Sequence, residues 1–326
     1  MVHVAVTGGT GHVGRAIVQG LVDSQEHQVF VFTRKATSVF DHLQAVKIIV
    51  ISYDDQDEIQ NVLDKHKIEV VLSTISPASS EAFDAQVRLI RACDKSESVK
   101  RFAPSEYLID YERDEEYQRF MPMLAFQRNI VKELRRHPNL EWTLFHNGYF
   151  MDYFGQPWAP TTMPSEVPFV DIEACQATIP GSGDDQVVWT HTTDVAKFVS
   201  RAISMKIGTW KEHSWIIGDK ASLHEILRAA EKARGVKFRV AYDSVEKLKG
   251  GEVTPIPGNK AHAALYSTPE FDAYPLVLAM FAGIGMAIVS GHLDVPEGES
   301  LNAEFPDIKT TKVVEFIKKY WSGRHP

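Results

Sequence analysis

The sequence contains very little cysteine, and Cys93 and Cys175 are the only two among its 326 residues. Their positions fit no metal-ligand or redox motif, so we interpret both as buried or incidental thiols. No Ser-His-Asp arrangement or cluster with metal-ligand spacing is visible, and no metal site is expected. Because no signal peptide precedes the first apolar run and cysteine is scarce, the sequence predicts a cytoplasmic protein.

Long hydrophobic runs and excess positive charge are also missing. The longest apolar stretch, residues 274–289, is too short for a membrane span and includes Pro275, Gly283 and Gly285. It predicts a buried or pocket-lining helix. The chain has 35 Lys and Arg against 43 Asp and Glu, and its formal net charge of −8 argues against a nucleic-acid-binding surface. We therefore expect neither nucleic acid nor membrane as a partner.

What the sequence does contain is a glycine-rich turn near its start. An apolar run over residues 4–6 is followed by Gly8, Gly11 and Gly14, and an amphipathic helix begins there. Gly8 permits a tight turn, Gly11 lets the backbone approach a phosphate, and Gly14 lets the helix pack against the strand. Free N–H groups at the helix N-terminus then attract the anion. The motif predicts a dinucleotide-binding site.

The end of the next expected strand, residues 28–32, indicates which dinucleotide is bound. Sites for NAD usually place an acidic residue about twenty positions after the last glycine, where it binds the ribose 2′-hydroxyl. This chain has Arg34 and Lys35 at that point. Two cations suit a 2′-phosphate, and an arginine also stacks on adenine. The sequence therefore favours NADP over NAD as the cofactor.

Strands and helices alternate along the first half of the chain. After the first strand and helix, further strands are expected over residues 28–32, 47–51, 69–73, 99–103 and 141–145, with helices between them ending near 65, 93 and 136. This alternation is typical of the α/β class and of a doubly wound parallel (Rossmann) sheet. Small hydroxyl residues such as Thr74 follow a central strand, where such a sheet meets its ligand.

The rest of the chain predicts a smaller, interleaved α/β substrate domain. We expect an NADP-binding Rossmann domain over residues 1–153, to which 186–218 returns. The substrate-binding part is expected over 154–185 and 219–309, and a C-terminal helix over 310–326. Segment 154–185 is rich in Pro and Gly, as suits loops that cover a substrate on a rigid scaffold.

Two helix starts in this part carry residues that favour capping. Thr192 or Thr193 is expected at the N-cap of the helix that runs to about residue 204. Ser222, followed three residues later by Glu225, has the sequence of a capping box.

Four segments together show a specific likeness. They are residues 7–14 (TGGTGHVG), 101–107 (RFAPSEY), 147–153 (NGYFMDY) and 301–306 (LNAEFP). These segments resemble the isoflavone-reductase-like and NmrA-like family of atypical short-chain dehydrogenase/reductases, especially its fungal secondary-metabolism type. The likeness covers essentially the whole chain. It implies NADP as cofactor, a small-molecule substrate, and a monomer or homodimer.

The helix near residues 122–136 departs from the resembled family. Leu124, Gln127, Ile130 and Leu134 recur at spacings of three and four, which places Gln127 on the inward face. Reductases of the resembled family carry a lysine that acts near substrate and nicotinamide at the position that Gln127 matches. Glutamine can hydrogen-bond a carbonyl or carboxamide, but it cannot deliver a proton at neutral pH. Loss of a general acid costs about 10²- to 10⁴-fold in rate.

The site residues expected from the motifs and the resemblance fall into two groups. The expected cofactor contacts are Thr7, Gly8, Thr10, Gly11, His12, Val13, Arg34, Lys35, Ser73, Thr74, Ile75, Ser105, Gln127, Gly148, Tyr149 and Phe150. The candidate catalytic residues are Gln127, Tyr117, Tyr149 and Glu116.

Three functions are compatible with these residues. The first is an NADPH-dependent oxidoreductase that reduces a C=C, C=O or C=N bond of an aromatic or alkaloid- or polyketide-type metabolite, with Tyr117 or Tyr149 as proton source. The second is a redox-neutral cyclase or isomerase on the same scaffold, in which acids such as Glu116 act as acid and base. The third is an NADP-sensing regulator without turnover. The replacement of the family lysine by Gln127 motivates both alternatives.

Overall fold

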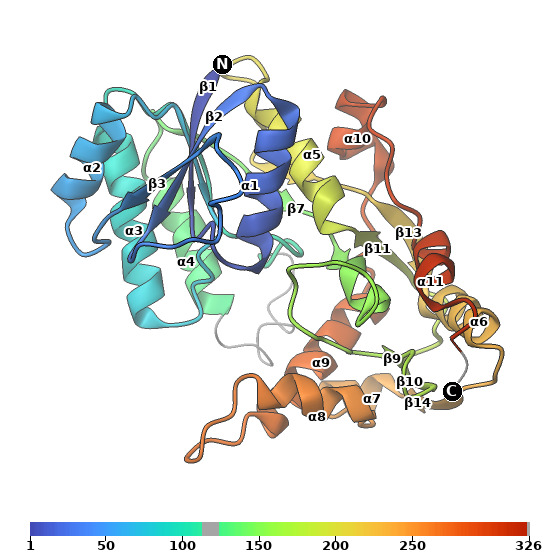
Figure 1. Ribbon diagram of the computed structural model, residues 1–326. Coiled ribbons are helices and arrows are strands. Elements are labelled where there is room, and N and C mark those ends of the chain that lie inside the picture. The colour runs from blue at the N-terminus through green and yellow to red at the C-terminus, as the bar shows by residue number, and fades with distance from the viewer. Residues whose placement is uncertain (113–123, 325–326) are drawn as a thin grey trace.

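A six-stranded parallel sheet forms the centre of the computed structural model, which describes residues 1–112 and 124–324 (Figure 1). Its strand order is β3-β2-β1-β4-β5-β6, and every neighbouring pair is parallel. The strands are β1 (Val2–Thr7), β2 (His27–Thr33), β3 (Val46–Val50), β4 (Val70–Ser73), β5 (Arg101–Ala103) and β6 (Glu141–Trp142). The chain leaves β1 toward β2 and β3 and later returns to the other side of β1, which confirms the doubly wound sheet.

Helices cover both faces of this sheet. They are α1 (His12–Ser24) and α5 (Thr192–Ile203) on one face, and α2 (Gln56–Lys65), α3 (Ser80–Lys95) and α4 (Leu124–Leu134) on the other (Figure 1). Side chains alternate along each strand, so Val4 and Val6 pack toward α1 and α5 while Ala5 packs toward α2 and α3. Both faces of β1 are therefore buried, as expected for a parallel sheet.

The expected strand over residues 141–145 is two separate strands. Glu141 and Trp142 pair with β5, whereas β7 (Leu144–His146) pairs with β12 (His213–Trp215). The chain then turns at Gly148, whose φ of +63° suits glycine, and enters β8 (Tyr149–Phe150). This short strand runs parallel to β11 (Gln186–Thr190), which also pairs with β13 (Asp219–Ser222).

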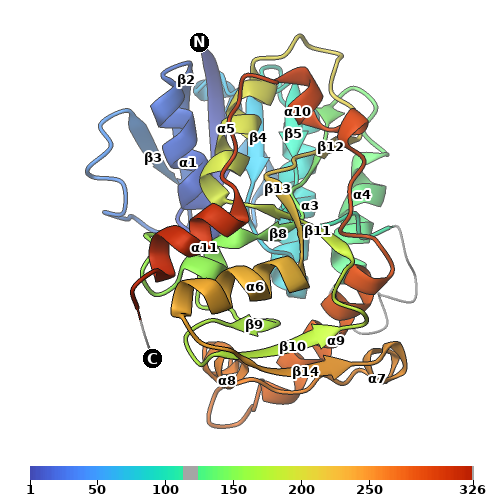
Figure 2. The same cartoon turned by 90° about the vertical axis from the view of Figure 1, so that its right-hand side faces the viewer.

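A second group of elements lies beside β8 and β11, on the lower side in Figure 2. It comprises η2 (Met151–Gly155), the strands β9 (Val170–Asp171), β10 (Gln176–Pro180) and β14 (Arg239–Asp243), and the helices α6 (Leu223–Arg234), α7 (Val245–Lys249), α8 (Pro257–Ala264) and α9 (Tyr274–Val289). Near the end of the chain, η3 (Glu297–Glu299) and α10 (Leu301–Glu304) precede α11 (Val313–Trp321), which packs against α6.

The expected apolar helix is α9, and it is buried along residues 281–288. This burial confirms the interpretation of residues 274–289 as a core helix. None of the helices that the structure describes has both the length and the apolar character needed to cross a membrane.

The two expected helix caps have different outcomes. Ser222 caps α6 in a complete capping box with Glu225, as predicted. The N-cap of α5 is His191, and the prediction of Thr192 or Thr193 is wrong. The ring of His191 accepts a hydrogen bond from the Thr193 amide, which satisfies one of the free N–H groups of the first turn.

Candidate functional site

The glycine turn between β1 and α1 is packed too tightly for any larger residue. Gly8 has a φ of +71°, and a Cβ there would lie 3.0 Å from the Ile75 amide nitrogen and the Thr74 carbonyl. A Cβ on Gly14 would lie 2.5 Å from the Gly8 oxygen and 2.7 Å from Thr74 Oγ1. Thr74 in turn donates to the Thr7 oxygen from both its amide and its hydroxyl, each at 2.9 Å. The predicted residues of β1, α1 and β4 therefore meet in one place.

The N-terminus of α1 has the character of an anion site. Gly11 is the N-cap and offers no side chain, and the first turn contains no acidic residue. The Gly11 amide donates to the Gly8 oxygen at 2.9 Å, and the first bond of the helix runs from the Arg15 amide to the Gly11 oxygen at 3.0 Å. The amides of His12, Val13 and Gly14 between them therefore have no intrahelical partner. Their partial positive charge adds to the helix dipole, and the predicted His12 and Val13 lie at this end.

Arg34 and Lys35 follow β2, the neighbour of β1, and both are exposed. Within residues 1–112 and 124–324, no acidic side chain forms an ion pair with either cation. Within this turn, Thr33 Oγ1 donates to the Lys35 oxygen at 2.6 Å. Two adjacent guanidinium and ammonium groups therefore face solvent beside the glycine turn.

Two buried polar side chains are candidates for the opposite end of the expected site. Gln127 of α4 is only 8% exposed, which confirms that it faces inward, and its Oε1 has no hydrogen-bond partner among the described residues. Asn147 is fully buried and its Oδ1 is likewise without a partner there. Buried polar atoms are normally paired, so these two oxygens are well suited to a bound ligand.

The remaining predicted residues lie at the carboxyl ends of β4 and β5 and in β8. Ser73 is fully buried at the end of β4, and Ser105 is half-buried just after β5. Gly148 donates to the Leu108 oxygen at 2.9 Å, which joins the segment after β5 to the turn before β8. The next two residues face opposite ways, since Phe150 packs with the sheet and α1 whereas Tyr149 packs with the second group of elements.

Tyr149 lies against a buried carboxyl that sequence reasoning missed. Its hydroxyl donates to Glu166 Oε1, and Glu166 Oε2 lies 3.8 Å from His262 Nε2. Burial raises the pKa of Glu166, while the imidazole of His262 and the hydroxyls of Tyr149 and Tyr153 oppose that shift. Glu166 is an isolated acid in a Pro-rich loop and His262 lies on a weakly patterned helix, so nothing periodic in the sequence marks either residue.

A second buried acid belongs to the RFAPSEY segment. Glu106 is 2% exposed, and burial raises the pKa of its carboxyl well above the usual value, as do the nearby Asp110 and Glu112. Its backbone oxygen accepts from the Leu108 amide at 2.9 Å. The motif was singled out for its likeness alone, and the chemistry of Glu106 was not anticipated. The candidates Glu116 and Tyr117 lie outside the described residues.

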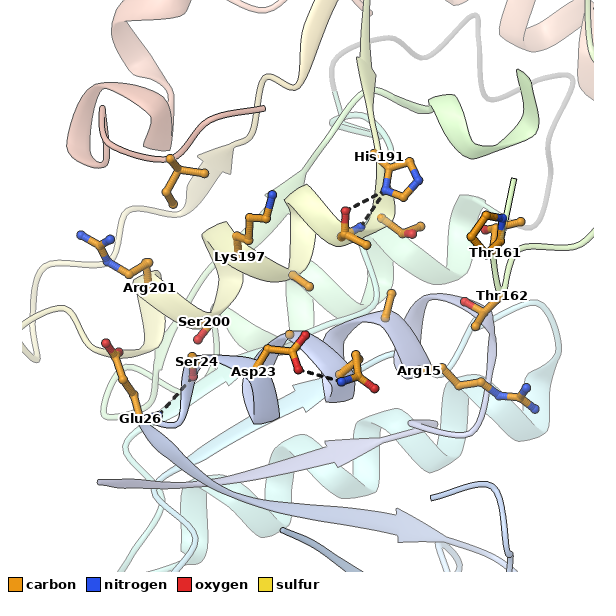
Figure 3. Close-up of a pocket in the computed structure, with 18 of the residues that line it drawn as sticks. Arg15, Asp23, Ser24, Glu26, Thr161, Thr162, His191, Lys197, Ser200 and Arg201 are labelled. Carbon is orange, nitrogen blue, oxygen red and sulfur yellow. Dashed lines mark hydrogen bonds between the residues drawn. The ribbon is translucent and has the colours of Figure 1, made fainter. Parts of the chain in front are cut away.

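A large cavity lies elsewhere, over the groove between α1 and α5 (Figure 3). Its volume is about 960 Å³, and it shares no residue with the predicted cofactor contacts. Arg15, Lys197 and Arg201 line it, but Lys197 pairs with Asp194 and Arg201 with Asp307. Arg15 forms no ion pair among the described residues and donates from Nε to the Thr10 oxygen at 2.8 Å, so two of these three cations are neutralised by acids of the protein.

The parallel sheet and the glycine turn before α1 define a Rossmann-type α/β protein. Within that class, the sequence model of the NmrA-like family matches residues 2–274, and the chain belongs to this family. The resemblance stated from the four segments is confirmed. Two curated fungal relatives agree. Oxidoreductase swnN of Metarhizium robertsii is 31% identical over 99% of this chain and 98% of the relative. Oxidoreductase BOA1 of Botryotinia fuckeliana is 39% identical over 73% of this chain and 78% of the relative.

Solved structures of plant enzymes have the same fold. The leucoanthocyanidin reductase–NADPH complex from Vitis vinifera superposes with a TM-score of 0.73 at 17% identity, over 98% of this chain and 99% of that chain. Isoflavone reductase superposes with a TM-score of 0.69 at 18% identity, over 98% of this chain and 99% of that chain. At these identities the likeness shows the fold.

Proposed function

We propose that the protein is an NADPH-dependent oxidoreductase that reduces a small metabolite. The observation that carries the proposal is the combination of the glycine turn, the uncapped N-terminus of α1 and the two cations after β2. The fungal relatives that align along most of the chain bear the name oxidoreductase, and the plant enzyme of the same fold was solved as an NADPH complex. Both facts support the proposal.

The chain's own residues fit each part of the cofactor. The backbone of residues 8–13 holds the pyrophosphate. A Cβ at Gly8 or Gly14 would collide with the residues that follow β4, so glycine is needed for the turn to pack closely against them. Arg34 and Lys35 hold the 2′-phosphate by charge. Gln127 and Asn147 offer their unpartnered oxygens at the far end, where a carboxamide donates hydrogen bonds. Bound NADPH supplies a hydride.

The proposed division of labour follows the order of the chain. Residues 1–153 with 186–218 bind the nucleotide, residues 154–185 and 219–309 bind the substrate, and the C-terminal helix within 310–326 stabilises α6. We propose an aromatic, alkaloid- or polyketide-type substrate, as the resemblance implies. The substrate carries a C=C, C=O or C=N bond.

The test is NADPH absorbance with the purified protein and a panel of enones, ketones and imines. Substrate-dependent loss of the reduced-nicotinamide signal supports the proposal. If NADPH binds, the signal persists and the substrate is nevertheless converted, the protein is a redox-neutral cyclase or isomerase. If NADPH binds and no substrate is converted, an NADP-sensing regulator is favoured. The assay includes the redox-neutral enzyme and the regulator as outcomes because Gln127 stands where the resembled reductases have a lysine.

A further inference from the structure

A buried chain of polar groups extends from Tyr149 into the second group of elements. It joins Tyr149 in β8, Glu166 in the loop before β9, and His262 in α8. The Tyr149 hydroxyl donates to Glu166 Oε1, and Glu166 Oε2 lies 3.8 Å from His262 Nε2. His262 Nδ1 lies 2.9 Å from the Ser165 oxygen. Because a carbonyl only accepts, Nδ1 carries a hydrogen, and Nε2 is the nitrogen that faces Glu166.

The side chains of these three polar groups are largely screened from water. Tyr149 is 4% exposed, the His262 side chain 2% and the Glu166 side chain 13%. Four polar side chains interact with Glu166, namely Tyr149, Tyr153, His262 and Tyr266. These four groups include no fixed positive charge that would hold Glu166 ionised, and burial raises the pKa of its carboxyl.

Packing alone gives no reason for this arrangement. A buried carboxyl costs free energy that an apolar side chain of the same size avoids, so such groups concentrate where chemistry needs them. Asn147 and Gly148, two residues of the candidate site, directly precede Tyr149 in the sequence. The row of polar groups therefore begins at the candidate site.

We propose that Tyr149 delivers the proton that completes the reduction, and that Glu166 replaces that proton. Tyr149 is then the catalytic residue, and Glu166 acts through it. The proposal rests on the reductase function proposed above. It assigns to a phenol the role that glutamine at position 127 cannot perform.

The atoms balance in four transfers. The substrate carbon takes a hydride with its electron pair from NADPH, and the π bond to its neighbour breaks. That neighbour, whether O, N or C, takes the proton of the Tyr149 hydroxyl. The phenolate oxygen of Tyr149 takes a proton from the Glu166 carboxyl. Glu166, whose side chain is 13% exposed, regains a proton from solvent, so one double bond, one NADPH and one proton give the saturated product and NADP⁺.

The protonation of Glu166 is tested without substrate or cofactor. We expect the infrared spectrum of the purified protein at neutral pH to contain a protonated-carboxyl band that Glu166→Gln removes. Tyr149→Phe should shift the same band, since it removes the hydrogen bond to Glu166. The matched control is Glu173→Gln, an exposed acid seven residues further along the chain, which should leave the band unchanged. Absence of the band from the wild-type protein would overturn the proposal.

The role in turnover is tested with a substrate found in the NADPH assay. We expect Tyr149→Phe to lower kcat about 10²- to 10⁴-fold, the typical value of a general acid. Glu166→Gln should remove the basic limb of the kcat–pH profile and should increase the solvent deuterium isotope effect on kcat. Thermal unfolding of each variant checks that it is folded, and Tyr153→Phe tests the second phenol beside Glu166.

The two levels of the proposal fail in different ways. A wild-type protein that oxidises no NADPH would remove both the reductase function and the proton route. An active wild-type protein whose kcat is unchanged in a folded Tyr149→Phe variant would remove the proton route alone. An active Tyr149→Phe variant with a Tyr153→Phe variant that loses kcat would also overturn it, because the other phenol would be the donor.

Discussion

At the residue scale, we expect the cations after β2 to decide which dinucleotide binds. A 2′-phosphate adds negative charge that is absent from NADH, and charge-assisted hydrogen bonds contribute about 1.5–3 kcal/mol each. We expect Arg34→Asp to weaken NADPH binding by about 10- to 100-fold and NADH binding much less. Titration of nucleotide binding by fluorescence or calorimetry measures both affinities.

The control for Arg34→Asp is Lys232→Asp, which makes the same change in net charge on exposed α6, remote from the glycine turn. It should leave both affinities as they are. An equal loss of NADPH and NADH affinity in Arg34→Asp contradicts the assignment of Arg34 to the 2′-phosphate.

Gln127 is the second residue whose role can be separated from binding. It is buried with an unpartnered Oε1, so its amide is available to orient the nicotinamide or the substrate. We expect Gln127→Ala to lower turnover while NADPH affinity stays largely intact, because most of the contacts to the nucleotide lie at the glycine turn and after β2. Steady-state kinetics together with binding titration checks this, and unaltered activity would remove Gln127 from the site.

A third residue prediction concerns pH. Because the pKa of Glu106 is raised in the folded protein, the folded state holds a proton that the unfolded chain releases above about pH 4.3. Its contribution to stability is complete below the unfolded-state pKa and is lost as pH rises toward the folded-state pKa. Glu106→Gln should therefore become more stable relative to wild type as pH rises through this window. Urea unfolding at several pH values measures the difference, and a constant difference contradicts the raised pKa.

The sequence predicted the residues that depend on local pattern and missed those that depend on distant contacts. The positions of the glycines, the inward face of Gln127 and the cations after β2 all follow from spacing within one element. Glu166 and His262 are 96 positions apart and meet only because α8 folds back over the loop before β9. No local pattern contains that information.

At the scale of elements, the turn that leads into β8 depends on Gly148. Gly148 has a φ of +63°, and a Cβ there would lie 2.3 Å from the Val188 oxygen. An alanine pays for the left-handed conformation, about 1–2 kcal/mol, and must also displace β11. We expect Gly148→Ala to lower the free energy of unfolding by more than that amount, measured by urea unfolding.

Gly208 offers the matched control for this prediction. Its φ is +84°, but a Cβ there would meet no atom within 4 Å. Gly208→Ala should therefore show the conformational cost alone. If both variants lose the same stability, the close approach of Gly148 to β11 contributes nothing.

Element boundaries were the least predictable feature. The apolar run after Glu141 suggested one strand, yet the chain leaves the sheet after Trp142 because β12 offers a second pairing partner to Leu144–His146. Propensity assigned the N-cap of α5 to a threonine, yet the His191 ring accepts the hydrogen bond from the Thr193 amide. In both cases a competing partner elsewhere in the fold decided the outcome.

At the scale of the whole molecule, the large groove between α1 and α5 stays separate from the predicted cofactor contacts (Figure 3). Size alone would have selected this groove as the functional site. Two cations of its lining, Lys197 and Arg201, are paired with acids of the same protein, whereas the N-terminus of α1 has no side-chain cap. The candidate site therefore rests on the sequence motif and not on the volume of a cavity.

One loop connects the two ends of the candidate site. Thr162 donates to the His12 oxygen at 2.6 Å and accepts from His12 Nδ1 at 2.7 Å, which ties the loop to the first turn of α1. Four positions later the same loop supplies Glu166, the partner of Tyr149. A nucleotide bound beside His12 would therefore contact the point where the loop that carries Glu166 is attached to α1. We expect an ordered kinetic sequence in which the nucleotide binds first and leaves last, so that NADP⁺ inhibits competitively against NADPH and the reduced product does not.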